Sequence, residues 1–316
     1  MGLTSDQVKA EARRQGFDLC GIAPVDAFPE LTHFREWIDR GYHGEMRYLA
    51  RSVERRRDVR AVLPSARAVI VLGTLYAVDR PYSTELADAD VARIARYAWG
   101  DDYHVVIGRR MEALLAWMRD AHGTPFDARP YVDTGPVQER AYAQRAGVGW
   151  VGKNTCLINP GLGSFLFLSE ILCSLPLEPD ESGVDQCGDC TLCLEACPTA
   201  AFVEPYVMDA RRCLSYLTIE LKGALPGDLA EAVGPHVYGC DICQEVCPWN
   251  QAVPVSHDPA WQPRAAFDRP RLADLRAMSD EDLRVALRGS AMKRAGVKGL
   301  RRNLAAAQGR PNGDTR

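Results

Sequence analysis

Two groups of closely spaced cysteines in the second half of this 316-residue chain restrict what it can fold into. The first group reads C-x2-C-x2-C-x3-C and the second C-x2-C-x3-C, and a proline follows the last cysteine of each. In such runs the cysteine before the proline ligates the cluster of the other group, because the proline turns the chain away from the nearer site. The pattern therefore predicts two 4Fe-4S clusters. The expected ligands are Cys187, Cys190, Cys193 and Cys247 for one cluster, and Cys197, Cys240, Cys243 and Cys213 for the other.

Structural zinc and disulfide bonds also use cysteines at short spacing. A zinc site needs neither a third cysteine three residues after the second nor a fourth cysteine followed by proline. A 4Fe-4S cluster of the ferredoxin type uses both. Disulfides suit small secreted chains, and no secretory signal is recognisable in this long one. The sequence therefore favours clusters over both alternatives. The three remaining cysteines lie in apolar segments and are predicted to be buried thiols: Cys20, Cys156 and Cys173.

Composition is that of a protein with an ordinary core, since 47% of the residues are hydrophobic. The net charge of −4 argues against a surface that coats nucleic acid over its whole extent. Arg13 and Arg14 form a twin-arginine pair, but no uninterrupted apolar stretch follows it, and no eighteen apolar residues run together anywhere. We therefore expect a cytoplasmic protein that makes no contact with a membrane.

Positive charge gathers near the end of the chain. Residues 288–302 contain six Lys or Arg residues and no Asp or Glu. Four of the six have helical spacing, which predicts one basic stripe. Such a stripe can meet the phosphates of a nucleic acid, or it can be the solvated face of a helix. The four residues are Arg294, Lys298, Arg301 and Arg302.

Hydrophobic periodicity predicts a sheet covered by helices in the first half of the chain. Residues 7–15 read as a helix, 17–23 as an extended segment and 66–76 as a buried strand. Residues 104–122 read as a helix that Asp101 and Asp102 cap. One face of that helix is apolar and should pack on the sheet. Its apolar residues are Ile107, Met111, Leu114, Leu115 and Met118.

Asp133 follows the next predicted strand, residues 128–132, and precedes a helix over residues 136–146 that a proline begins. The end of a strand is a common place for working residues, although an aspartate there can also be a turn or a helix cap. The segments 147–154 and 159–164 are rich in glycine. Glycine lets the backbone approach a large ligand closely, but such segments can also be simple turns.

We expect an α/β (α+β) fold in three parts. Residues 1–178 form a sheet-and-helix domain, residues 179–252 a ferredoxin-like module with both clusters, and residues 253–316 a short helical basic segment. In the last part, Ser279 and Asp282 form a helix-start box.

Several longer sequence segments resemble those of the epoxyqueuosine reductase family, and the resemblance extends over nearly the whole chain. These segments are residues 99–104 (WGDDYH), 131–136 (YVDTGP), 149–154 (GWVGKN), 213–223 (CLSYLTIELKG), 238–250 (YGCDICQEVCPWN) and 288–303. The resemblance implies an oxidoreductase of tRNA queuosine biosynthesis that reduces epoxyqueuosine, at the wobble position of a tRNA, to queuosine. It also implies a cobalamin in the domain of residues 1–178, charged by the clusters.

The resemblance assigns individual residues as well. Asp133 would be the proton donor in a two-electron removal of the epoxide oxygen by cob(I)alamin, and an apolar pocket would keep its carboxyl protonated. Ala95 stands where some members have a cysteine near cobalt. His104 is interpreted as a structural residue at a helix start. Four further cobalamin contacts and one tRNA contact follow the family words: Arg56, Lys153, Ser215 and Asp241, and Lys222.

The implied partners are a queuosine-type tRNA anticodon loop and a low-potential electron donor such as a flavodoxin or a ferredoxin. The implied oligomeric state is a monomer. Many relatives continue into HEAT-like repeats, which this chain lacks. Two other functions stay open. The first is a reductase that uses a corrinoid and iron–sulfur clusters on another substrate, as reductive dehalogenases do. The second is an iron–sulfur electron carrier without catalytic activity. The carrier would leave the large preceding domain and Asp133 without a purpose.

Overall fold

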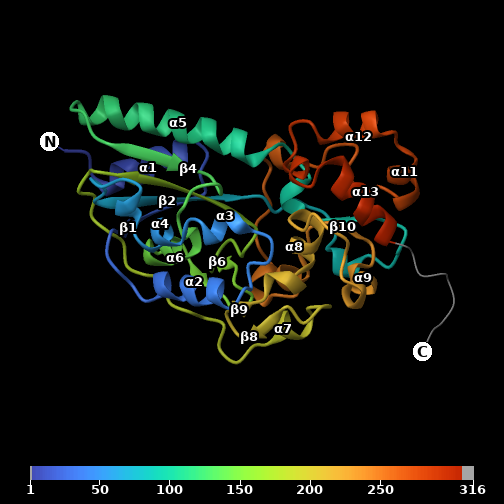
Figure 1. Cartoon of the computed structure of the whole chain (residues 1–316). Coiled ribbons are helices and arrows are strands. Elements are labelled where there is room, and N and C mark those ends of the chain that lie inside the picture. Colours follow the sequence, from blue (N-terminus) through green and yellow to red (C-terminus); the bar gives the residue numbers. More distant parts are fainter. Residues whose placement is uncertain (1, 308–316) are drawn as a thin grey trace.

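A four-stranded antiparallel sheet is the centre of the first half of the molecule (Figure 1). The computed structural model describes residues 2–307. The strand order is β1 (Leu19–Pro24), β2 (Ala68–Leu75), β7 (Leu166–Cys173) and β4 (Ala128–Tyr131). The expected mixture of sheet and helices is confirmed, and the antiparallel pairing makes the fold α+β.

Strand β2 is buried along its whole length because helices cover both faces of the sheet. Successive side chains of a strand point to opposite faces. Ile70 and Leu72 accordingly join the core under α5 (Tyr103–His122), whereas Val69 and Val71 join the core under α6 (Glu139–Arg145). Residues 66–76 had been predicted as a buried strand, and this is confirmed.

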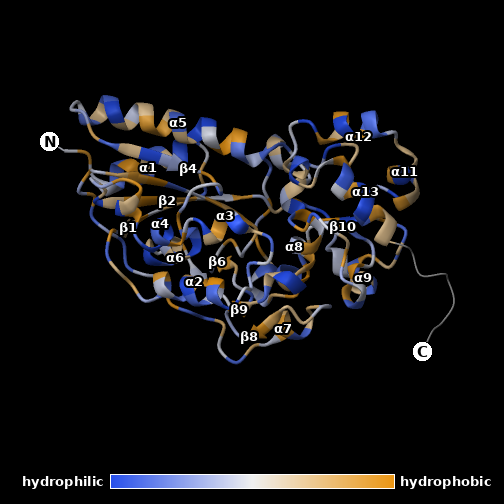
Figure 2. Cartoon of the chain, viewed as in Figure 1, coloured by the Kyte–Doolittle hydropathy of each residue, from blue (hydrophilic) through white to orange (hydrophobic). Residues whose placement is uncertain are grey.

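Helix α5 lies along one side of the sheet, and Figure 2 shows hydrophobic and hydrophilic residues alternating around it. The five predicted apolar residues are all buried, together with Tyr103. Asp102 caps the helix by accepting from the backbone N–H of His104, and Gly123 ends it with a φ of 73°. Helix α1 (Ser5–Arg14) packs near it and carries a capping box at Thr4. Both helix predictions are confirmed.

Helix α6 covers the opposite face and begins at Glu139, three residues after the proline that was expected to begin it. The reason is a tight turn: Asp133 has a φ of 59°, and the N–H of Thr134 donates to the carbonyl of Val132 at 2.6 Å. Pro136 therefore still lies in the loop. Three short helices lie near α6: α2 (Glu30–Asp39), α3 (Arg47–Ala50) and α4 (Val53–Arg57).

Each cysteine group of the cysteine-rich module contains a short helix, which includes Cys193 in the first group and Cys243 in the second. These helices are α7 (Leu192–Glu195) and α10 (Ile242–Glu245). Between them lie β8 (Phe202–Glu204), β9 (Val207–Met208), α8 (Leu214–Ile219), α9 (Gly227–Val233) and β10 (His236–Tyr238). Strand β10 pairs with β3 (Arg93–Ile94), which comes from the first predicted domain. The division at residue 178 stays a prediction, since segments from both sides of it share this sheet.

The C-terminal segment packs into the module as part of its core. It contains α11 (Leu272–Ala277), α12 (Asp280–Leu287), the 3-10 turn η7 (Ala291–Arg294) and α13 (Gly296–Ala306). Ser279 and Asp282 form the predicted capping box. The amide of Asn303, which is fully buried, donates to the carbonyls of Thr218 at 2.7 Å and Val237 at 2.8 Å. The end of α13 is thereby fixed to α8 and β10.

The glycine-rich segments bring the chain close to itself. The first contains β5 (Trp150–Val151), which pairs with β6 (Leu157–Ile158) just before the second. A Cβ atom at Gly149 would lie 2.2 Å from the carbonyl oxygen of Ile158, and one at Gly163 would lie 2.0 Å from the side-chain oxygen of Asn250. Glycine is therefore needed here for contacts within the chain.

Among residues 2–307, no helix combines the length and the apolar composition needed to cross a membrane. All eleven cysteines are free thiols, so the disulfide alternative does not describe this chain.

Candidate active site

Four of the predicted cluster ligands face one shared cavity. Its lining includes Cys187, Cys190, Cys193 and Cys247 together with Trp249. The first three thiols come from the loop around α7, and the fourth comes from the end of α10, beside its proline. The fold thus brings the last cysteine of the second group to the first three cysteines of the first group, which is the crossed arrangement that the spacing predicts.

The other four predicted ligands influence one another's ionisation, which places them together. Burial raises the pKa of the Cys213 thiol, and Cys197 adds to this. Burial also raises the pKa of Cys240, with Cys213 adding to it. At Cys243 a hydrogen bond with Cys156 raises the pKa most, followed by burial and by the charges of Cys240 and Cys213. A bound metal would draw these protons off.

The three remaining cysteines are not alike. Cys173 is fully buried, as predicted, and burial raises the pKa of its thiol to about 11. Cys20 and Cys156 are only partly buried, so for them the prediction was wrong. The apolar residues around Cys156 in the sequence did not reveal that its thiol lies against Cys243, a predicted cluster ligand.

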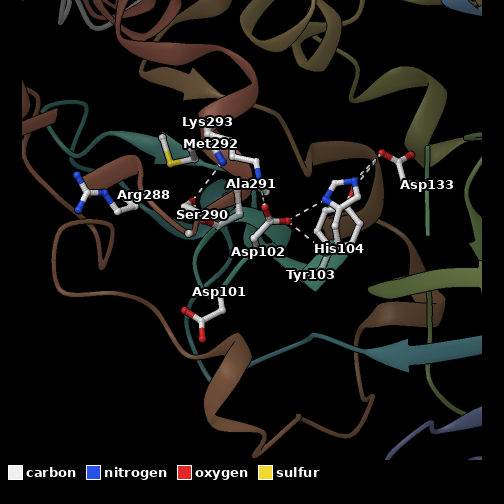
Figure 3. Close-up of polar contacts among 12 residues, drawn as sticks. Asp101, Asp102, Tyr103, His104, Asp133, Arg288, Ser290, Ala291, Met292 and Lys293 are labelled. Atoms are coloured by element: carbon white, nitrogen blue, oxygen red, sulfur yellow. Dashed lines mark hydrogen bonds and ion pairs between the residues drawn. The ribbon is translucent and has the colours of Figure 1, made fainter. Parts of the chain in front are cut away.

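Asp133 lies in the turn between β4 and α6, with its side chain 58% exposed. Two neighbouring residues at the start of α5 contact its carboxylate (Figure 3). The hydroxyl of Tyr103 donates to Oδ2 at 3.0 Å, and Nε2 of His104 lies 3.4 Å from the same oxygen. The Tyr103 ring is stacked on Phe167 of β7, with centroids 4.6 Å apart, which fixes its hydroxyl over the loop.

The other nitrogen of the His104 ring also contacts a carboxylate. This nitrogen, Nδ1, lies 2.8 Å from Oδ1 of Asp102, whose side chain is only 2% exposed. The other oxygen of Asp102 lies 2.5 Å from the ammonium of Lys293 in η7. Figure 3 shows the resulting row of charged groups, which runs from the C-terminal segment to Asp133.

The ionisation of this row corrects one expectation. Partial burial acts to raise the pKa of Asp133, but the hydrogen bonds from His104 and Tyr103 outweigh it, and the pKa lies below its usual value. Burial acts to lower the pKa of His104, but Asp133 and Asp102 outweigh it and raise that pKa. An apolar pocket that keeps Asp133 protonated was predicted, whereas the contacts with His104 and Tyr103 lower the pKa of Asp133 and so favour its ionised form.

Two buried carboxyl groups lie near Asp133 on the α6 face of the sheet. Glu170 of β7 is fully buried and neither of its oxygens has a partner within the described residues. Burial raises its pKa well above the usual value. Burial, and then the charge of Asp133, raises the pKa of Glu139 on α6 to about 7. Both groups therefore hold protons where free carboxyl groups would not.

The predicted cobalamin contacts make bonds within the chain. Arg56 donates to the carbonyl of Val137 at 2.6 Å, next to the Asp133 loop. The ammonium of Lys153 donates to the carbonyls of Gly188 at 2.5 Å and Cys190 at 3.0 Å, beside the first cluster site. Ser215 and Asp241 lie beside the second set of cysteines. The hydroxyl of Ser215 is 3.5 Å from the Cys240 carbonyl, and Asp241 accepts from the N–H of Arg96 at 2.7 Å.

The predicted basic stripe does not form. Arg294 lies in η7, before α13 begins, and it makes a two-bond ion pair with Glu220. Arg301 and Arg302 donate to backbone carbonyls, among them that of Leu217 at 2.6 Å. Their guanidinium groups hold α13 against its neighbours. Lys222 and Lys298 remain exposed, and the Lys222 ammonium is 3.4 Å from the Arg294 carbonyl.

Sequence reasoning missed the partners of Asp133. His104 was taken as a structural residue, and Tyr103 and Lys293 were not singled out. The word WGDDYH contains Asp102, Tyr103 and His104, so its acidic, phenolic and imidazole groups were the available signal. That these groups face Asp133 follows only from the docking of α5 beside β4.

Two family models match parts of this chain. Residues 56–134 match the model described as "Epoxyqueuosine reductase QueG, DUF1730", and residues 186–250 match the model of a 4Fe-4S double cluster binding domain. The epoxyqueuosine reductase of Pseudomonas aeruginosa is 41% identical over 307 residues, covering 96% of this chain and 85% of that protein. That of Gloeobacter violaceus is 43% identical over 318 residues, covering 98% and 97%.

Solved structures give the same result. A crystal structure of epoxyqueuosine reductase with an epoxyqueuosine-modified tRNA-Tyr stem loop has a TM-score of 0.86 and 30% identity, covering 96% of this chain and 80% of that one. A Bacillus subtilis epoxyqueuosine reductase, described with a catalytic aspartate loop swung out of the active site, has a TM-score of 0.83 and 30% identity over 96% and 80%. The chain therefore belongs to the epoxyqueuosine reductase family.

Proposed function

We propose that this protein reduces epoxyqueuosine to queuosine at the wobble position of a tRNA. The observation that carries the proposal is Asp133, exposed on a strained turn and contacted by two donors, in a chain that also has a 4Fe-4S double cluster binding domain. Removing an epoxide oxygen as water takes two electrons and two protons. The clusters account for the electrons and the Asp133 turn for the protons.

Each cluster site is assigned by the way the fold groups the thiols. Cys187, Cys190, Cys193 and Cys247 share a cavity and would hold one cluster. The charge of Cys197 acts on Cys213, and the charge of Cys213 acts on Cys240 and Cys243, so these four thiols would hold the other cluster. A flavodoxin or a ferredoxin fits as the electron donor, because the clusters accept electrons one at a time.

Cobalamin fits the open face next to Asp133. The Tyr48 side chain is 46% exposed, and partial burial of its hydroxyl, with the charges of Glu220 and Asp133 adding to it, raises the pKa of that hydroxyl to about 12. The exposed Tyr48 ring and the exposed Asp133 carboxylate, whose charge acts on Tyr48, would offer a surface on which a large ring system can lie. When bound, cobalamin would supply a two-electron reductant. Arg56, Lys153, Ser215 and Asp241 would hold it, and Asp133 would face the substrate.

RNA binding would use the exposed basic residues that remain free of strong ion pairs. Lys222 and Lys298 meet this condition, and Arg294 can exchange Glu220 for a phosphate. Arg301 and Arg302 would act indirectly, by fixing α13. A base in an anticodon loop can be turned out into a pocket while its phosphates lie on such a surface. We expect the protein to act as a cytoplasmic monomer.

The test is conversion of an epoxyqueuosine-containing tRNA stem loop by anaerobically purified protein. Iron, cobalt and corrinoid analysis should give eight irons and one cobalamin per chain, whereas clusters without a corrinoid would favour the electron carrier. The Asp133→Asn variant should keep both chromophores and lose most activity, by roughly 100-fold or more. Asp101→Asn is the matched control, because Asp101 is 57% exposed and its ion pair is with Arg264, away from Asp133. Full activity of Asp133→Asn would remove the proposed mechanism.

A further inference from the structure

His104 is the side chain that links Asp133 to the rest of the charged row. Both nitrogens of its ring face carboxylate oxygens, Nδ1 at 2.8 Å from Asp102 and Nε2 at 3.4 Å from Asp133 (Figure 3). An ionised carboxylate only accepts hydrogen bonds. Each ring nitrogen therefore needs its own proton to make a favourable contact, and an imidazole with two N–H groups is an imidazolium. The geometry is that of a charged His104.

The two carboxylates are themselves held in the ionised form. Asp102 is nearly buried, and its two oxygens face the His104 ring and the Lys293 ammonium. It also accepts from the backbone N–H of His104 at 3.2 Å, so the residue cannot turn away without uncapping α5. Asp133 accepts from the Tyr103 hydroxyl. Every contact that the described residues make to these carboxylates comes from a donor.

An ionised Asp133 has no proton to give, so the reaction proposed above needs a neighbouring proton source. We propose that His104 is that source, that Asp133 relays its proton to the substrate oxygen, and that Asp102 and Lys293 are positioning residues that hold the ring. This inference rests on the proposed function and names a second proton-transfer group for it.

The step balances as two proton transfers. The N–H bond at Nε2 of His104 breaks as an O–H bond forms on Asp133, and that O–H bond breaks as the oxygen leaving the epoxide is protonated. Imidazolium becomes neutral imidazole, and no electrons move in this step. The His104 side chain is 32% exposed, so solvent water can return a proton to it. A second transfer then completes the water molecule, while the two electrons come from the clusters.

Other titratable groups near the site are less suitable as the source. Tyr103 holds its proton strongly, since burial and then the charge of Asp133 raise the pKa of its hydroxyl. Glu139 lies on α6 and contacts the Asp133 loop through the backbone of Asp133, and within residues 2–307 no hydrogen bond joins the two carboxyl groups. The charged groups around His104 are therefore Asp102, Asp133 and Lys293, with Arg140 acting on Asp133 from α6.

The first experiment measures His104 directly, by NMR titration of its ring protons in the holoprotein. We expect its pKa to lie above the ordinary histidine value, and to fall toward that value in Asp133→Asn, because one of its two carboxylate partners is lost. His257, an exposed loop residue, serves as the reference signal in the same spectra. A wild-type His104 that titrates at or below the His257 value would overturn the inference.

The second experiment tests proton delivery in single-turnover conversion of the modified stem loop. His104→Gln should lower the rate by roughly 100-fold with cluster content and RNA affinity unchanged, and should lose the fall in rate that the wild type shows as pH rises through the His104 pKa. His104→Ala should regain rate on adding free imidazole, since the position is partly open to solvent. A purely structural role for His104 predicts no such rescue. His257→Gln serves as the control.

Lys293→Met tests the positioning role, and it should lower the single-turnover rate several-fold while leaving RNA affinity within about two-fold. Undiminished activity of His104→Gln, in a preparation whose wild type is active, would sink this inference alone. A wild type that is inactive on the stem loop would instead sink the proposed function. Should His104→Gln lose its clusters, the wild-type titration decides the question.

Discussion

Tyr103→Phe isolates one hydrogen bond to Asp133 and changes little else. The phenylalanine ring can keep the stack on Phe167, at 4.6 Å and 9° between planes, so only the hydroxyl is lost. That hydroxyl donates to Oδ2 of Asp133 at 3.0 Å. A hydrogen bond to a charged group contributes about 1.5–3 kcal/mol, and the 58% exposure of the Asp133 side chain argues for the lower end, because water replaces the lost donor.

About 1.5 kcal/mol corresponds to about one pKa unit, since one unit is 1.36 kcal/mol. The hydrogen bond stabilises the carboxylate, so its loss should raise the pKa of Asp133 by about one unit. The measurement is a titration of the Asp133 carboxyl carbon by NMR in protein labelled at aspartate, assigned with Asp133→Asn. The matched control is Tyr97→Phe, which removes a hydroxyl bonded to Tyr238 and leaves Asp133 untouched. An Asp133 pKa that is equal in the wild type and in Tyr103→Phe would refute the reasoning.

Three further outcomes follow from the structure. The pKa of Glu139 is about 7 in the folded protein against 4.5 in the free residue, so the folded protein loses stability as pH rises from 4.5 to 7. Relative to the wild type, the free energy of unfolding of Glu139→Gln should therefore increase by up to about 3 kcal/mol over that pH range, as measured from denaturation curves at both ends. Asn303→Ala leaves two buried carbonyls without donors and should cost about 1–3 kcal/mol in the free energy of unfolding, with an exposed Lys298→Ala near zero. Cys213→Ser should remove about half of the iron, whereas Cys173→Ser should leave the iron content unchanged.

Much of the scaffold could be predicted from the sequence because local patterns determine it. The apolar residues of α5 recur at helical spacing and face the sheet as expected, and β2 is buried on both faces as its apolar run indicates. The cysteine grouping was predictable for a similar reason. Because a 4Fe-4S cluster needs four thiolates and a proline follows the last cysteine of each group, few assignments of the cysteines to the clusters are possible. The fold brings Cys247 to the cavity that the first group lines.

The charged residues were harder to predict, because their partners lie far away in the chain. Arg302 reads as a residue for phosphate contact, yet its guanidinium satisfies carbonyls at the end of α8. Lys293 belongs to the same basic stretch of the sequence, yet its ammonium faces a nearly buried aspartate. The pKa of Asp133 was misjudged for the same reason. Its position after a strand was predictable, whereas two donors from α5 became visible only once that helix was docked.

The C-terminal segment can now be given a role that does not depend on further repeats. The matched region covers 97% of the Gloeobacter violaceus relative but only 80% of the Escherichia coli one, so family members share this portion and differ in what lies outside it. Within the shared portion, Asn303 fixes α13 to α8 and β10, and Lys293 of the preceding turn faces Asp102. Because Asp102 orients His104 and His104 faces Asp133, the packing of this segment determines where the proton is held.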